Sequence, residues 1–139
     1  MANTVTMKAY KVSEIVFYNK VQGKVQLKLN NKVSHNVKYS QNGICEAVMT
    51  VEVFDKEHFD VLNVKVTING VFEVTPGVEK EFVHVDTFKE MFPFAKALVT
   101  TLSANAGIPP IMVKNVDIEK QEIYRFEMGN KEGFYERAS

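Results

Sequence analysis

The chain has 139 residues, of which 45% are hydrophobic, and its 17 basic and 17 acidic residues give a formal net charge of zero. This length and composition predict one globular domain over residues 1–139 and exclude a largely disordered chain. A neutral chain lacks the basic excess that drives binding to phosphate backbones, so nucleic acid is not an expected partner. The sequence has no run of about 18 apolar residues, so insertion into a membrane is not predicted.

Two further features indicate the compartment. Cys45 is the one cysteine, so no intrachain disulfide can form and a disulfide-dependent secreted fold is excluded. The first residues lack the apolar core of a signal peptide. We therefore expect a cytoplasmic protein.

Apolar and polar residues alternate in three segments of the first half. Over residues 24–39 the odd positions are largely apolar and the even positions are polar, which is typical of an antiparallel strand with one buried face. Residues 40–43 predict a turn. The alternation returns over residues 47–53 and again over residues 62–68, with a turn predicted at 55–58. The first half therefore predicts an antiparallel sheet.

The dipeptide Asn69-Gly70 leaves a choice for the third of these strands. Asn-Gly is typical of a two-residue hairpin turn. A hairpin, however, would turn Phe72 and Val74 onto the polar face, whereas a continuous strand over residues 60–75 keeps them in phase with the earlier apolar positions. The phase favours one long strand with Gly70 as a kink or bulge.

The second half changes to a helical period, and its apolar residues recur at spacings of three and four: Phe88, Met91, Phe92, Ala95, Leu98, Val99 and Leu102. This stripe predicts an amphipathic helix, with Asp86 as its N-cap and Gly107 as its C-cap. Pro93 leaves two options, because the helix either kinks there or begins near Phe92. Beyond it, residues 117–124 predict a short second helix and the polar residues 129–139 predict a frayed tail.

The sequence contains no Gly-x-Ser-x-Gly, phosphate-loop, dinucleotide or His-Glu-x-x-His motif. His58 and His84, with the carboxylates near them, match no metal-ligand spacing. His35 lies on the apolar stripe of a strand and is interpreted as a partly buried or interface residue, and Cys45 as a small buried one. We predict no catalytic residue, no metal and no cofactor. A small enzyme or ligand-binding module with a closed pocket remains an alternative.

The chain is rich in adaptable apolar side chains, with 10 Phe, 5 Tyr, 6 Met and no Trp. Residues 15–18 are apolar on both faces of the strand they predict. Such residues fill a core or, where exposed, bind apolar peptide segments of varied sequence. The peptide-binding candidates are Phe17, Tyr18, Phe72, Phe88, Phe92 and Phe94, and about half of them are expected to pack in the core.

Residues 91–111 read MFPFAKALVTTLSANAGIPPI, and Asn115-Val-Asp follows. This segment resembles the SecB-type chaperones, in which a Leu-Phe-Pro-Tyr-Ala-Arg-like helix start precedes a helix, a Gly/Phe-Pro stop and a Pro-rich lead into Pro/Asn-Val-Asn/Asp. Upstream, residues 14–17, 45–53 and 66–74 are similar to three strand segments of that family, in the same order. The resemblance is strongest over residues 9–118.

The resemblance implies a SecB-like α+β fold, in which a four-stranded antiparallel Greek-key sheet is followed by a long helix packed against it. It also implies a homotetramer, built as a dimer of dimers, that holds unfolded polypeptides without ATP. In export relatives the client is a preprotein and the partner is the SecA motor. In relatives from toxin–antitoxin systems the client is an antitoxin.

Charge separates this chain from the export members of the family. Those members are acidic, whereas this chain is neutral and has Lys65 where the family has an acidic residue, and Lys96 where it has Arg. No SecA-contacting residue is therefore carried over to this chain. We predict a chaperone for unfolded polypeptides that is not an enzyme. The alternatives are a dedicated chaperone of an antitoxin or other single client, or an oligomeric scaffold of the same fold.

Overall fold

The computed structural model describes residues 4–22, 28–57, 61–108 and 111–113. The predicted second helix and the predicted tail lie outside these residues. The described chain forms one antiparallel sheet and one helix, with these bounds: β1 (Val5–Asn19), β2 (Leu29–Tyr39), β3 (Ile44–Asp55), β4 (Leu62–Val74) and α1 (Lys80–Asn105).

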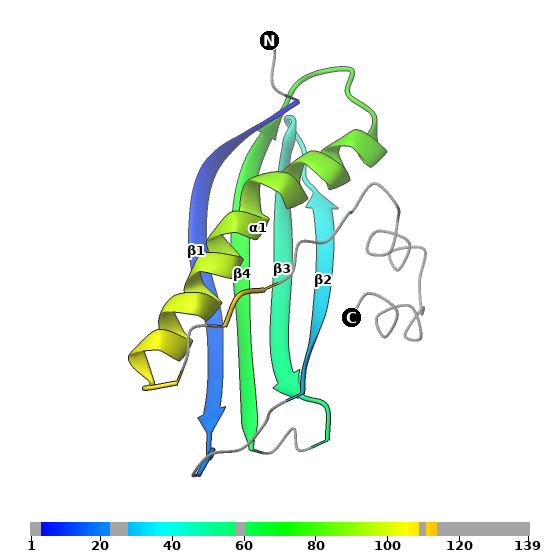
Figure 1. Cartoon of the computed structure of the whole chain (residues 1–139). Helices are drawn as coiled ribbons and strands as arrows, with labels where there is room; N and C mark the ends of the chain where they lie inside the picture. Colours follow the sequence, from blue (N-terminus) through cyan, green and yellow to red (C-terminus); the bar gives the residue numbers. More distant parts are fainter. Residues whose placement is uncertain (1–3, 23–27, 58–60, 109–110, 114–139) are drawn as a thin grey trace.

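The strands lie in the order β1-β4-β3-β2, and every neighbouring pair is antiparallel. β2, β3 and β4 form a meander, and β1 lies beside β4 at the far edge, which is a Greek-key arrangement. α1 crosses one face of the sheet diagonally, from β2 at its first residues to β1 at its last (Figure 1). The predicted α+β fold is confirmed.

The core lies between α1 and the two central strands. Burial alternates strictly along β3 and over most of β4, as the period-two pattern predicts. The helix-facing residues of these strands include Cys45, Met49, Val51, Leu62, Val66, Ile68 and Phe72, all fully buried. Their partners on α1 form the predicted helical stripe, of which Phe88, Met91 and Val99 are buried. Burial of this apolar surface is the main term that stabilises the fold.

β4 runs unbroken through Gly70, so the continuous strand was the right choice. Gly70 is not a bulge, because the register of β4 against β3 continues evenly past it. Its small size has another reason: a Cβ atom there would lie 2.9 Å from Phe72 Cε1 and 3.2 Å from Met91 Sδ. Gly70 therefore gives the side chain of Met91 room to pack against the sheet.

The bulges of this sheet lie in β1. Its pairing with β4 shifts between Met7 and Ala9, and again between Val12 and Glu14. Each extra residue reverses the side-chain phase, so the helix-facing positions follow an irregular series: Val5, Met7, Tyr10, Val12, Ile15 and Phe17. This irregularity hides most of β1 from a period-two reading.

α1 begins earlier than its apolar stripe indicates. Its N-cap is Glu79, and Asp86 lies inside the helix, where it accepts a hydrogen bond from the Thr4 hydroxyl, so the prediction of Asp86 as N-cap was wrong. A helix start near residue 92 was also wrong, since α1 continues through the exposed Pro93. The helix ends close to the predicted stop, but its C-cap is Ala106 and not Gly107. Gly107 follows the cap with a φ of +85°, and its N–H donates to the Ala104 carbonyl.

Candidate functional site

An uncovered row of apolar side chains runs along β1 beside α1. Tyr10, Val12 and Ile15 face the helix side of the sheet, since they pair with Gly70, Ile68 and Val66. They remain 38–45% exposed, and Phe94 of α1 is 47% exposed. The Phe94 ring lies over this row, 5.0 Å from the Tyr10 ring between centroids. We call Tyr10, Val12, Ile15 and Phe94 the β1–α1 strip.

The strip exists because a single helix cannot cover a sheet of four strands. The first turns of α1 lie over β2, where the Tyr39 hydroxyl donates to the Lys80 carbonyl. The last turns reach β1, where the Asn19 amide donates to the Ala106 carbonyl. Because α1 crosses the sheet diagonally, it passes over β1 only with these turns and leaves much of that strand uncovered (Figure 1). Contiguous exposed apolar side chains of this kind mark interaction sites.

The same strand is an edge of the sheet. β1 pairs with β4 along one side, and the described chain places no strand on its other side. Its outer backbone N–H and C=O groups are therefore open to pairing with a further strand. Edge and strip together offer both the hydrogen-bonding groups and the apolar surface that a second extended chain would need.

Three of the six predicted peptide-binding aromatics lie in the core of the folded chain. Phe72, Phe88 and Phe92 are 0%, 2% and 6% exposed. The Phe88 and Phe92 rings stack at 4.9 Å, one helical turn apart on the buried face of α1. Within a single folded chain these three side chains are not accessible to a peptide.

The other three predicted aromatics reach the surface at separate places. Phe17 is half-buried against the core on the helix side of β1, and Tyr18 lies on the opposite face of the sheet at 53% exposure. Neighbouring residues of a strand point to opposite faces, so these two cannot line one groove. Phe94 belongs to the β1–α1 strip. Sequence reasoning named neither Tyr10 nor Val12, because the bulges conceal their common face.

A smaller apolar cleft lies where the chain returns after α1. Ile111 and Val113 are buried against the sheet. Two side chains of α1 bind this segment: the Thr100 hydroxyl donates to the Ile111 carbonyl at 2.7 Å, and the Ile111 N–H donates to the Ser103 hydroxyl oxygen at 2.8 Å. The cleft has a volume of about 60 Å³ and is lined by Leu29, Asn30, Asn31, Val53, Ile111, Met112 and Val113. Met112 is 77% exposed at its rim, and Leu29 is exposed as well. We call it the Leu29–Met112 cleft.

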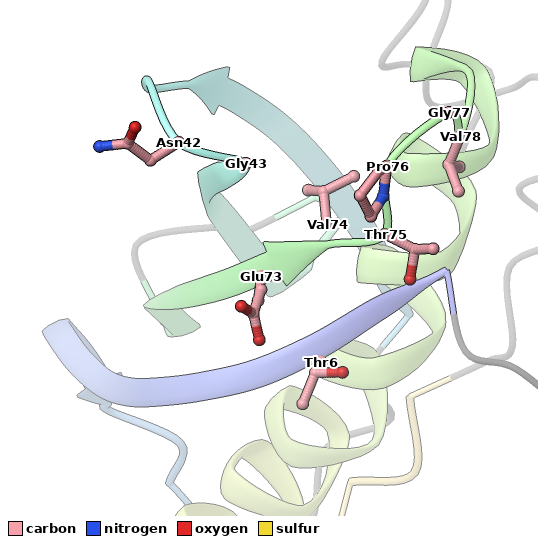
Figure 2. Close-up of a pocket in the computed structure, with 9 residues that line it drawn as sticks. All are labelled: Thr6, Asn42, Gly43, Glu73, Val74, Thr75, Pro76, Gly77 and Val78. Carbon is pink, nitrogen blue, oxygen red and sulfur yellow. The ribbon is translucent and has the colours of Figure 1, made fainter.

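A second hollow, of about 540 Å³, lies at the end of the sheet where the β2–β3 turn meets the loop before α1 (Figure 2). Among its nine lining residues only Glu73 carries a charge, and that carboxylate lies 3.8 Å from Lys8 Nζ. Figure 2 shows the Asn42 side chain pointing away from Glu73. No pair of acid–base groups converges here, so this hollow has little to offer catalysis.

Neither nucleophilic nor metal chemistry is indicated elsewhere in the described residues. Burial raises the pKa of the Cys45 thiol, which keeps it protonated and unreactive. Within the described ranges no three His, Cys, Asp or Glu residues are grouped as metal ligands would be; His58 and Asp60 lie outside those ranges. In the same part of the chain, no helix combines the length and apolar character needed to cross a membrane.

The face of the sheet that α1 leaves open carries charged and polar groups that balance one another. Across it, Asn69 and Asn63 of β4 donate to Glu46 and Glu52 of β3, at 3.0 and 2.7 Å. Lys65 Nζ lies 3.8 Å from Glu14 Oε1 of β1. The acidic groups of this face are thus matched by amides and lysines, and they do not form an acidic surface for a basic partner.

The described residues thus form a four-stranded antiparallel sheet with one long helix and a row of exposed apolar side chains at one edge. The family model of preprotein translocase subunit SecB matches residues 4–130, and the chain belongs to this family. The members of this family are chaperones and not enzymes. The resemblance found in the sequence is thereby confirmed.

Individual relatives are distant. An uncharacterized protein of Methanocaldococcus jannaschii is 26% identical over 100 residues, which cover 67% of this chain and 64% of that protein. The chain thus matches somewhat less than two-thirds of its relative's length. Among solved structures, the SecB-like chaperone Rv1957 of Mycobacterium tuberculosis, in complex with a ChAD peptide from the HigA1 antitoxin, has the same fold. It matches with a TM-score of 0.62 and 11% identity, over 82% of this chain and 88% of its own.

A protein of unknown function from Streptococcus agalactiae is similar at a TM-score of 0.48 and 10% identity, over 83% of this chain and 100% of its own.

Proposed function

We propose that this protein is an ATP-independent chaperone that holds unfolded polypeptides and assembles from several copies of this chain. The main support is apolar surface left uncovered by a fold that buries the helix-facing residues of its central strands. A holding chaperone needs no catalytic group; it lowers the free concentration of unfolded chains by binding them. Membership of the SecB family supports the same function. We place it in the cytoplasm, where such clients are met before folding or export.

The β1–α1 strip best fits self-association. It combines an open strand edge with apolar side chains, and a second copy brings the same two features related by a two-fold axis. Antiparallel pairing of two β1 strands would cover Tyr10, Val12 and Ile15 and would bring two Phe94 side chains together. A dimer formed in this way would leave other surfaces for the dimer-of-dimers contact that the family resemblance implies.

The Leu29–Met112 cleft better fits the client. It is apolar, it is set away from the open edge of β1, and Met112 at its rim is a flexible side chain that adapts to different partners. At about 60 Å³ the cleft holds only a small side chain unless its rim moves. Tyr18 adds an exposed aromatic contact on the other face of the sheet. A client would then touch each copy at separate points and gain affinity by multivalency.

A dedicated client is a second candidate function. The solved structure of the M. tuberculosis relative contains an antitoxin peptide. The charge-balanced open face of this sheet lacks the acidic character of export members that meet SecA. We therefore favour a single antitoxin or other specialised client over general preprotein export with SecA.

The test combines light scattering from a denatured client, diluted into the protein without nucleotide, with the mass of the protein in solution. We expect suppression of aggregation by a near-stoichiometric amount of an oligomer. Phe94→Ser should lower the oligomer mass, whereas Met112→Ser should keep the mass and weaken suppression. Phe82→Ser is the matched control, since Phe82 is 55% exposed on the same helix but outside both surfaces.

Different results separate the hypotheses. An oligomer that suppresses no general client but protects a co-expressed single client supports the dedicated chaperone. A protein that forms the oligomer and protects neither kind of client is a scaffold, and the chaperone proposal is then wrong. If Phe82→Ser and Phe94→Ser lower the oligomer mass equally, the assignment of the β1–α1 strip to assembly is wrong.

A further inference from the structure

Two buried histidines meet between the sheet and the first turns of α1. His35 comes from the middle of β2 and is 0% exposed, and His84 comes from α1 and is 2% exposed. Their rings lie 4.9 Å apart between centroids at 69°, and the Phe88 ring stands edge-on to His35 at 5.4 Å. This cluster lies in the first turns of α1, where the helix crosses β2, and away from Phe94.

The hydrogen bonds of Thr87 determine which ring nitrogen of His35 carries the proton. The Thr87 hydroxyl donates to the His84 carbonyl at 3.1 Å, so its single proton is engaged there. In the hydrogen bond of 2.9 Å between His35 Nε2 and the Thr87 oxygen, the imidazole N–H must then be the donor. His35 is therefore the neutral Nε2–H tautomer, and its buried Nδ1 has no hydrogen-bond partner. A second proton on Nδ1 would be a buried charge without an acceptor.

The His35 ring lies among largely apolar neighbours, and its burial disfavours that charge. Met49 pairs with His35 on β3, and Val33 and Val37 flank it on the same face of β2. On the helix-facing side of β2 and β3 the other titratable groups are Tyr39, Cys45 and Asp55, which lie toward the ends of these strands; Tyr10 lies on the same face but on β1, across the sheet. On α1, Lys80 and Glu81 lie one turn before His84 and are exposed. Burial and the neighbouring His84 hold the pKa of His35 well below its usual value, and burial lowers the pKa of His84 to about 4.

We propose that His35, His84 and Thr87 form a proton-operated latch that fastens the first turns of α1 to β2 and releases them in mildly acidic solution. In the closed state both imidazoles are neutral. Once this end of the helix lifts, both are hydrated and bind protons with ordinary histidine affinity. Protons therefore bind the open state in preference, and lowering the pH shifts the equilibrium toward it. The opened end uncovers apolar residues such as Val33 and Val83, far from the β1–α1 strip.

The size of the effect follows from this linkage. For an open-state pKa near 6.5 and a closed-state pKa well below it, the opening equilibrium rises about tenfold per histidine between pH 7.5 and 5.5. The pair should therefore raise opening about a hundredfold. Amide hydrogen exchange of residues 83–88, corrected for intrinsic rates, measures it directly, and the amides of β3 and β4 report global unfolding in the same sample.

Variants assign the effect to the two imidazoles. His84→Phe keeps a ring of similar size, and His35→Gln keeps a donor for Thr87, but neither can titrate. Each should reduce the pH response to about tenfold, and the double variant should abolish it. His58→Gln, which changes the third histidine of the chain, should leave the response intact. Far-UV circular dichroism at pH 7.5 checks that each variant folds.

The unaltered protein supplies a test that depends on no variant. Nitrogen-15 shifts of the histidine rings should show His35 as the Nε2–H tautomer, with both rings neutral at pH 6. A ring of either residue that titrates near pH 6.5 in the folded chain would overturn the latch. So would a loss of protection in residues 83–88 that is matched by the central strands at every pH, because the helix would then not open by itself.

Discussion

β4 and β1 lie side by side and are of similar length, 13 and 15 residues, yet they use their apolar side chains differently. α1 covers one face of β4, which lies between β1 and β3 in the sheet, and the helix-facing residues of β4 are almost wholly buried. β1 has an apolar helix-facing row as well, but Tyr10, Val12 and Ile15 stay over one-third exposed. The comparison teaches that apolar character alone does not separate core from interface. What separates them is whether the single chain has a second layer to place over the residue.

The largest effect should come from truncating an aromatic residue under the helix. Phe72→Ala removes a fully buried ring that packs beside Met91, and it should cost about 3–5 kcal/mol of unfolding free energy. Phe82→Ala, at a ring 55% exposed, should cost less than about 1 kcal/mol. Urea unfolding followed by far-UV circular dichroism measures both, at one protein concentration because assembly shifts apparent stability.

A similar loss for both variants would contradict the division between covered and uncovered residues. It would mean that Phe82 is buried in the assembled protein to the same extent as Phe72 is buried in the single chain. Dilution would then reveal the cause, since the loss at Phe82 would shrink as the assembly dissociates.

The covered region was the part that the sequence could predict. β3 and β4 keep an even register, so every second residue faces α1 and the period-two pattern is read directly. The choice of a continuous strand at Gly70 followed from the same phase. On α1 the stripe from Phe88 to Leu102 was equally plain, but His84 and Thr87 are polar by type and buried in fact, which concealed the first turns of the helix.

The uncovered region could not be predicted in the same way. The two bulges of β1 break its phase, so Tyr10 and Val12 do not appear as one face with Ile15. The aromatics proposed from composition were a mixed set, because a count of Phe residues says nothing about which of them α1 covers. Phe88 and Phe92 belong to the helical stripe and pack inward, whereas Phe94, two residues further, points out.

A smaller effect should follow from closing the space at Gly70. In Gly70→Ala the new methyl carbon would meet Phe72 Cε1 at 2.9 Å and Met91 Sδ at 3.2 Å, so the side chains beneath the helix must shift. Overpacking of this kind costs about 1–3 kcal/mol, partly offset by the lower chain entropy of alanine in the unfolded state. We expect a net loss of about 1 kcal/mol in urea unfolding.

A double-mutant cycle identifies the contact responsible. Met91→Ala opens space above Gly70, so Gly70→Ala should cost less in that background than in the natural one. A cost that is unchanged by Met91→Ala would show that the strain lies against Phe72 or the backbone and not beneath the helix.

The smallest effect should come from the charges that join β1 to β4 on the open face. Lys65 Nζ and Glu14 Oε1 are 3.8 Å apart, and both side chains are substantially exposed. Exposed ion pairs contribute little because water and salt screen them, so Glu14→Gln should change the unfolding free energy by less than about 0.5 kcal/mol. A larger loss, removed by high salt, would mean that charge fastens β1. A small loss would mean that backbone pairing and the half-buried apolar residues hold β1 in the sheet. The apolar row of β1 is then available to contact a second copy.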